Sequence, residues 1–190
     1  MRDRRAETVK CLVIALALAW LLPSAVSADG APKAEAPKDI EAKLAAMGIE
    51  LPTLSPPSAN FVRAVRSGNL VFLAGHGPSK PGGGYVQGRL GQDLSIEEGY
   101  EAARLTAIAL LASLKAEIGD LDRVKRIVKV HGMVRATPAF TDHSSVMNGC
   151  SDFLVELFGE PRGKHARAAV GMASLPLGFA VEIEMIVEVD

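Results

Sequence analysis

The sequence predicts an α+β fold in which one mixed β-sheet packs against two long helices. Two segments with an apolar face at helical spacing alternate with runs of β-branched residues, and the last run of the chain has a two-residue apolar period. With 190 residues, 48% hydrophobic and 23% charged, the chain has enough apolar content for one domain with a proper core.

The first 28 residues have the pattern of a secretion signal. Basic residues precede an uncharged apolar run over 11–22, and small residues lead to Ala28. Because this run is shorter than the ~20 residues of a membrane-spanning helix, we expect cleavage after Ala28 and export, to the periplasm or outside the cell. An uncleaved membrane anchor is the alternative. Residues 29–38 are rich in Ala, Pro, Lys and Glu, which predicts a flexible linker before a domain over 39–190.

Charge and cysteine content narrow the function classes. Without the predicted signal, 17 basic and 20 acidic residues remain, a net charge near −3. This balance argues against a general nucleic-acid surface, which requires a basic stripe. Cys11 lies inside the signal, so Cys150 is left as a single thiol without an internal disulfide partner. Cys150 falls on an apolar helix face, which favours a buried, unreactive thiol over a nucleophile.

The first predicted elements are a short helix and a hairpin. Asp39 can cap a helix that stops at Gly48, where a left-handed conformation ends it. Two β-rich runs follow over 61–65 and 70–74. The segment 66–69 between them contains Gly and Asn, which predicts a tight turn.

Two long helices flank a central strand. Ser95 and Glu98 form a capping box, and apolar residues then recur at helical spacing until Gly119. The segment 123–135 has β-branched residues mostly at period two and predicts a strand. A second amphipathic helix is expected over 141–158, before a terminating glycine.

The chain is expected to end in two strands, 166–174 and 179–189, that pair as a hairpin. In this pairing Arg167 and Glu182 share one face, separated by ~13 Å along the strand. A guanidinium that binds a carboxylate and a carboxylate that orients water would then flank a small ligand. Other readings stay open: Arg167 in a structural ion pair, and Glu182 as a solvated residue.

One sheet face lacks a helical cover in this arrangement. We expect Ala169, Gly171, Ala173 and Ile186 to lie on it among charged residues. An uncovered face of this kind predicts self-association.

The carboxy-terminal region resembles the signature of the Rid (YjgF) family. The residues that carry the resemblance are His-Ala-Arg-Ala-Ala-Val-Gly over 165–171, Leu-Pro over 175–176 and Val-Glu-Ile-Glu over 181–184. Phe-Leu-Ala-Gly-His-Gly over 72–77 supports it. The resemblance extends over about residues 55–190. It implies a chorismate-mutase-like fold, a homotrimer, and hydrolysis of reactive enamines or imines such as 2-aminoacrylate to a keto acid and ammonia.

The resemblance also assigns roles to individual residues. Arg167 falls on the carboxylate-binding arginine and Glu182 on the glutamate that handles water. Phe61 stands where deaminases of the family often have Tyr, and Ala169 where they often have Cys. The predicted site consists of the catalytic residues Arg167 and Glu182 and the substrate-binding residues Phe61, Gly75, His76, Asn148 and Ala169.

Three functions follow as hypotheses. The first is an enamine or imine deaminase that acts on small carboxylate-bearing molecules at trimer interfaces. The second is a non-catalytic trimer that binds carboxylate metabolites or protein surfaces. The third is an endoribonuclease of the L-PSP type, which the acidic composition disfavours. No cofactor is required, and four histidines without ligand spacing predict no metal site. The expected partners are the substrate and other copies of the chain, without nucleic acid or, after cleavage, a membrane.

Overall fold

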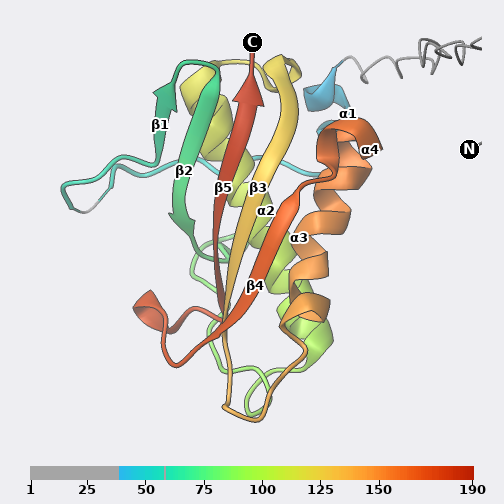
Figure 1. The fold of residues 1–190 in the computed structure, drawn as a ribbon. Helices are drawn as coiled ribbons and strands as arrows, with labels where there is room; N and C mark the ends of the chain where they lie inside the picture. The colour runs from blue at the N-terminus through green and yellow to red at the C-terminus, as the bar shows by residue number, and fades with distance from the viewer. Residues whose placement is uncertain (1–38, 58) are drawn as a thin grey trace, which may run out of the picture. The chain divides into compact units, whose positions relative to one another are not determined.

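The computed structural model describes residues 39–57 and 59–190, so the predicted signal and linker lie outside the described residues. A five-stranded sheet with the order β1-β2-β5-β3-β4 has its helices on one side (Figure 1). The strands are β1 (Ala64–Ser67), β2 (Leu70–His76), β3 (Val124–Arg135), β4 (Ala166–Met172) and β5 (Val181–Val189). The helices are α1 (Ile40–Ala46), α2 (Ile96–Ile118), α3 (His143–Phe158) and α4 (Glu160–Gly163), with 3₁₀ turns η1 (Leu121–Arg123) and η2 (Pro176–Gly178). This architecture confirms the predicted α+β class.

The predicted helix caps are present. The Asp39 side chain accepts a hydrogen bond from the Ala42 amide, at the start of α1. Both hydrogen bonds of the Ser95–Glu98 capping box form at the start of α2. Helices α2 and α3 pack together on the sheet, and Gly149 permits their close approach because a Cβ there would overlap the Tyr100 main-chain carbonyl.

The first strand lies further along the chain than predicted. The sequence pattern placed it at 61–65, whereas β1 covers Ala64–Ser67. Ser67 pairs with Leu70, so that only Gly68 and Asn69 form the turn, and Gly68 has a φ of +62°. A two-residue turn of this kind continues the ladder into residues that we had assigned to the loop.

The predicted hairpin of the last two strands is wrong. β5 lies between β2 and β3, and β4 pairs with β3 in parallel at the edge of the sheet. The reason is the connection through α3: β3, α3 and β4 form a strand–helix–strand unit, whose two strands run parallel. The loop that contains η2 then carries the chain past β3 to β5 (Figure 1).

The strand register assigns each residue to a face of the sheet. Leu73, Met185, Val130 and Arg167 lie side by side in one row, and the first three are at most 4% exposed beneath the helices. Ala169 is two residues after Arg167 and packs against the core, so it lies on this helix face together with Gly171. The expectation that Ala169 and Gly171 lie on the uncovered face is therefore wrong.

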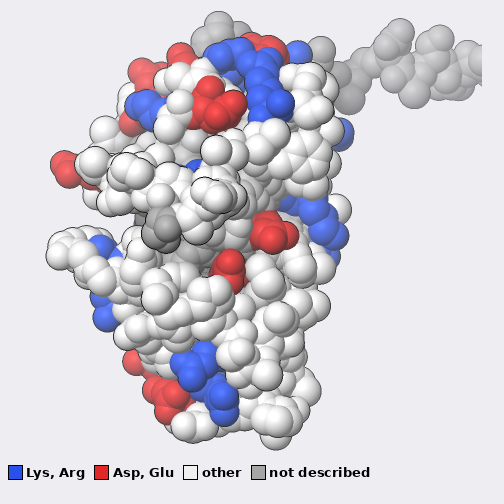
Figure 2. All heavy atoms as spheres, turned by 90° about the vertical axis from the view of Figure 1, so that its left-hand side faces the viewer, with Lys and Arg blue, Asp and Glu red and all other residues white. Residues whose placement is uncertain are grey.

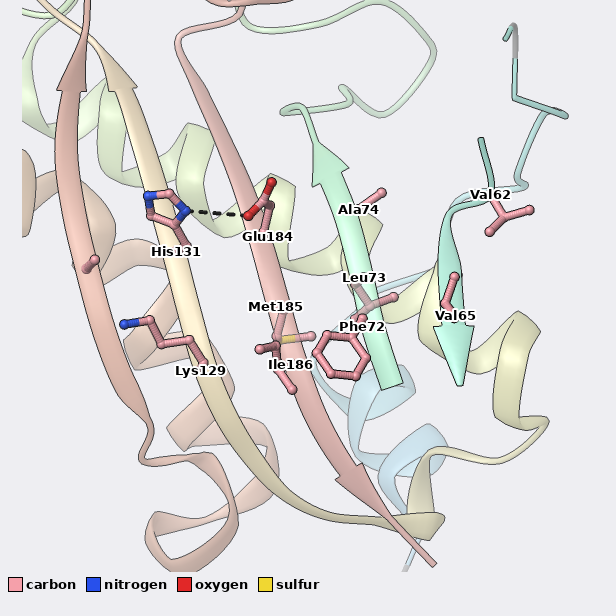
Figure 3. A pocket seen from close by; sticks show the side chains of 11 residues that line it. Val62, Val65, Phe72, Leu73, Ala74, Lys129, His131, Glu184, Met185 and Ile186 are labelled. Carbon is pink, nitrogen blue, oxygen red and sulfur yellow. Dashed lines mark hydrogen bonds and ion pairs between the residues drawn. The ribbon is translucent and has the colours of Figure 1, made fainter. Parts of the chain in front are cut away.

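None of the described helices covers the opposite face of the sheet, which is called the open face here (Figures 1 and 3). Its central row contains Val65, Phe72, Ile186 and Lys129, of which Val65 and Phe72 are about half exposed. On the β1 side of the molecule, Figure 2 shows a broad uncharged region between mixed charges, without a continuous basic stripe. Within residues 39–57 and 59–190, no helix has the length and apolar character to span a bilayer.

Candidate functional site

Arg167 is held against α3 by its guanidinium. Nη1 donates to Asn148 Oδ1 at 2.9 Å and to Ser151 Oγ at 3.0 Å, and Nη2 donates to the Ser144 carbonyl at 3.4 Å. The structure therefore brings together Arg167 and Asn148, two of the predicted site residues. These bonds use three of the five guanidinium donors. Among the described residues, Nε–H and the second Nη2–H form no further bond, and together they make a side-on fork that matches a carboxylate.

Ser151 and His165 are two members of this cluster that the sequence reasoning missed. Ser151 Oγ lies 3.1 Å from His165 Nε2, and His165 Nδ1 lies 2.7 Å from the Gly163 carbonyl. Asn148 and Ser151 are three residues apart on α3, and His165 and Arg167 are two apart along the chain. Both spacings place side chains on a common side and could have identified the pairs. We call Arg167, Asn148, Ser151 and His165 the arginine half-site.

Glu182 lies on the open face. Its neighbour across the ladder is Met133, which in turn pairs with Val170 at the edge. Gly75 of β2 packs directly against it, since a Cβ on Gly75 would overlap Glu182 Oε1. Burial raises the pKa of the Glu182 carboxyl, and the neighbouring Glu184 carboxylate raises this pKa further. We call Glu182, Glu184 and Gly75 the glutamate half-site.

The two half-sites do not face each other within one chain. The row that contains Arg167 lies beneath the helices, whereas the row that contains Glu182 lies on the open face. The expectation that these two side chains share a face is wrong, because it depended on direct pairing of β4 with β5. With β3 inserted between them, Arg167 aligns with Val130 and Glu182 aligns with Met133.

Two of the remaining predicted site residues, His76 and Ala169, lie on the helix face of the sheet, whereas Glu182 lies on the open face. His76 is 5% exposed, and its ring lies between the Ala74 carbonyl (2.7 Å from Nδ1) and Ser113 Oγ (2.6 Å from Nε2) on the helix side. Ala169 lies on the helix face, in the row that passes through Ile183 to His76. Phe61 is 50% exposed and precedes β1 by three residues.

A shallow depression of about 610 Å³ lies on the open face (Figure 3). Its walls include exposed apolar side chains of β1 and β2, while His131 and Glu184 contribute polar groups 3.4 Å apart, from Nδ1 to Oε2. Phe72 and Ile186 project into the lower part of this depression in Figure 3. An apolar hollow of this kind on an uncovered sheet face is typical of a surface that contacts another protein chain.

One acidic cluster and the buried thiol are accounted for by structural contacts. Glu41, Asp120 and Asp122 lie close enough together to hold a cation. However, the Asp122 carboxylate accepts bonds from the first amides of α1, and Glu41 accepts from the Leu121 amide and pairs with Lys115. Cys150 is fully buried, and burial raises the pKa of its thiol to about 12, which agrees with the predicted unreactive thiol.

Comparisons with known proteins agree with this fold. Residues 41–189 match the family model described as "YjgF/chorismate_mutase-like, putative endoribonuclease". Protein TCP17 of Trypanosoma cruzi is 44% identical over 151 residues, which cover 80% of this chain and 94% of that protein. The mitochondrial protein MMF1 of Saccharomyces cerevisiae is 30% identical over 134 residues, covering 70% of this chain and 78% of that protein.

Two solved structures are similar over most of the chain. Protein Atu1372 of Agrobacterium tumefaciens, described as having unknown function, has a TM-score of 0.73 and 42% identity, over 80% of this chain and 92% of that one. A protein of Shewanella oneidensis has a TM-score of 0.75 and 31% identity, over 79% of this chain and 99% of that one. The Shewanella protein is described as a "putative endoribonuclease", whereas the descriptions of TCP17, MMF1 and Atu1372 name no activity or substrate.

Proposed function

Because the chain belongs to the YjgF/chorismate-mutase-like family, we propose that it hydrolyses small 2-imino acids, or the enamines from which they form, to 2-keto acids and ammonia. The observation that supports this proposal most directly is the anchored Arg167. Its Nη1 is occupied by Asn148 and Ser151, and its side-on fork of Nε–H and Nη2–H remains for a ligand. A fork of this shape selects a planar carboxylate.

Glu182 supplies the second function, which is control of a water molecule. Partial burial and the charge of Glu184 raise the pKa of its carboxyl, so this group accepts a proton more readily than an exposed glutamate. The carboxylate removes a proton from water as the water oxygen bonds to C2 of the imine. The C=N electron pair moves to nitrogen, which takes up this proton from the Glu182 carboxyl and gives a carbinolamine. The Glu182 carboxylate then takes the hydroxyl proton and passes it to the amine as the C–N bond breaks, so that ammonia leaves and the hydroxyl oxygen becomes the keto oxygen.

The position of the two half-sites requires a second copy of the chain. Since Arg167 and Glu182 lie on opposite faces of one sheet, a substrate cannot contact both in one chain. Arg167 lies on the edge strand β4, whereas Glu182 lies on the open face with its apolar depression. A head-to-tail ring of subunits would bring the β4 edge of one copy to the open face of the next and complete one site per interface. We therefore propose a trimer.

Turnover is tested by measuring ammonia and keto acid release from imines generated enzymatically from several amino acids. We expect turnover by the purified protein and at least a hundredfold loss in Arg167→Ala, because the variant lacks the group that orients the carboxylate. Ser145→Ala on the same helix is the matched control. If no imine is hydrolysed although 2-oxobutanoate binds and binding requires Arg167, the protein is a carboxylate-binding trimer rather than a deaminase.

The shared site is tested by complementation between two inactive variants, Arg167→Ala and Glu182→Gln. When both are co-expressed in equal amounts, about a quarter of all sites in a cyclic trimer combine an intact Arg167 with an intact Glu182 of the neighbour. Activity near that fraction of the wild-type value is expected. If the mixture stays inactive while mixed trimers are verified by native mass spectrometry, both residues of a site come from one chain.

Export is also part of the proposal, since the residues that predict it lie in the segment 1–28. The mass of the protein recovered from its native cells tests it. A mass that begins at Asp29 is expected, whereas a full-length mass in the membrane fraction would indicate an anchor.

A further inference from the structure

A chain of hydrogen bonds leads from the Gly163 carbonyl through His165 and Ser151 to Arg167. The carbonyl can only accept, so His165 Nδ1 carries a proton and donates to it. In the neutral ring, Nε2 then has a lone pair and accepts the Ser151 hydroxyl proton. The lone pairs of Ser151 Oγ are therefore available to Arg167 Nη1, which lies 3.0 Å away.

We propose that Ser151 and His165 are positioning residues that hold the Arg167 guanidinium on α3, and that protonation of His165 weakens this hold. The inference rests on the proposed function, because it concerns the same carboxylate-binding arginine. It goes further in identifying a pH-dependent control of that arginine.

Among residues 39–57 and 59–190, one charged group, the Arg167 guanidinium, acts on the His165 ring. Ser151 faces it from α3 and the Gly163 carbonyl faces it from the end of α4, and both groups are uncharged. The charge that acts on the ring is the guanidinium of Arg167 on β4. Cys150, the neighbour of Ser151 on α3, is a neutral thiol because its pKa is raised to about 12.

Protonation reverses the direction of one hydrogen bond. A charged His165 has N–H donors on both ring nitrogens, so Nε2 would donate to Ser151 Oγ. The same oxygen would then accept from two cations, imidazolium and guanidinium, that repel each other. Burial lowers the pKa of His165 and the charge of Arg167 lowers it further, so the neutral ring is the resting state at neutral pH.

The test measures binding of 2-oxobutanoate, an unreactive probe with the proposed product's carboxylate, by calorimetry between pH 7.5 and pH 5.5. The probe stays ionised throughout this range. Ser151→Ala should raise the Kd roughly tenfold at pH 7.5, because a hydrogen bond to a charged group is lost. Ser151→Thr keeps the hydroxyl and should restore binding. Ser145 makes no hydrogen bond to Arg167 within the described part of the chain, so Ser145→Ala should bind as the wild type does.

The pH profile separates control of Arg167 from a simple structural role. The wild-type Kd should rise as the pH falls below 6.5, the ordinary pKa of histidine. His165→Gln retains an acceptor for Ser151 but cannot titrate, so its Kd should stay constant. The inference is overturned if the Ser151→Ala and wild-type Kd values agree, or if the His165→Gln profile follows that of the wild type. If Arg167→Ala and all of these variants bind the probe as tightly as the wild type does, the proposed function itself is contradicted.

Discussion

Two histidines in this molecule make the same pair of local hydrogen bonds in very different surroundings. The Nδ1 atoms of His76 and His165 each lie 2.7 Å from the carbonyl two residues earlier in the chain. The Nε2 atoms lie 2.6 Å from Ser113 Oγ and 3.1 Å from Ser151 Oγ, respectively. Each histidine therefore connects a strand end to a helix through a serine.

The difference lies in what the serine contacts next. Ser113 is 2% exposed and lies in the core between α2 and the sheet. Among the described residues, the hydrogen-bond chain from His76 does not continue beyond Ser113. Ser151 is half-buried and also accepts from Arg167, the residue with the free fork. The same His–Ser pair thus fixes the β2 end beside Gly75 in one place and a guanidinium in the other. Function therefore depends on a His–Ser pair only where the serine also contacts a functional group, as Ser151 contacts Arg167.

The largest expected difference between the two pairs is in stability when each histidine is replaced by alanine. His76→Ala should reduce the free energy of unfolding by about 3 kcal/mol, because it leaves a core cavity and an unsatisfied Ser113. His165→Ala should cost about 1 kcal/mol, since water reaches a half-buried site. Urea unfolding at pH 7.5 measures both. Equal losses would show that the two pairs do not differ in burial energetics.

A second expected difference is in how strongly each histidine makes the free energy of unfolding depend on pH. Burial is the main cause that lowers the pKa of both histidines from 6.5. A lowered folded-state pKa means that the unfolded chain binds protons first, so the stabilisation is complete above pH 6.5 and is lost as the pH falls below it. Each neutral histidine adds a slope of up to ~1.4 kcal/mol per pH unit.

Urea unfolding between pH 7.5 and pH 5 measures this slope. His76→Gln should flatten the profile more than His165→Gln, because His76 is the more deeply buried ring. The subtraction of variant from wild-type profiles removes the contributions of carboxyl groups such as Glu182. A variant profile parallel to that of the wild type would mean that the pKa of His76 is the same in the folded and the unfolded protein.

Local signals in the sequence predicted most of the elements. The capping box at Ser95 and Glu98, the alternation in β5 and the left-handed Gly48 each depend on residues a few positions apart. The order of the strands could not be obtained in this way. A Leu-Pro-Leu-Gly segment between two strands resembles a hairpin turn locally, whereas the insertion of β3 depends on the parallel crossover through α3.

In the candidate site, too, the individual residues could be predicted from the sequence but their arrangement could not. Arg167, Asn148, Gly75 and Glu182 were identified individually, and two contacts among them, Arg167 with Asn148 and Gly75 with Glu182, are present. Their division into two half-sites follows from strand order and was therefore missed. Ser151 and His165 were missed because each is unremarkable alone, and only the packing of α3 against β4 joins them.

The smallest expected difference separates the two serines. Ser113→Ala should cost roughly 1–3 kcal/mol, because it leaves the buried Nε2 of His76 without a donor. Ser151→Ala should cost less than about 1 kcal/mol, because water can bond to His165 and Arg167 at the half-exposed edge. Urea unfolding of both variants, combined with 2-oxobutanoate binding, measures stability and affinity in the same preparations. Ser113→Ala should leave the Kd unchanged, whereas Ser151→Ala should change the Kd and hardly affect stability. If Ser113→Ala weakened 2-oxobutanoate binding as strongly as Ser151→Ala does, the end of β2 would also affect ligand affinity, through Gly75.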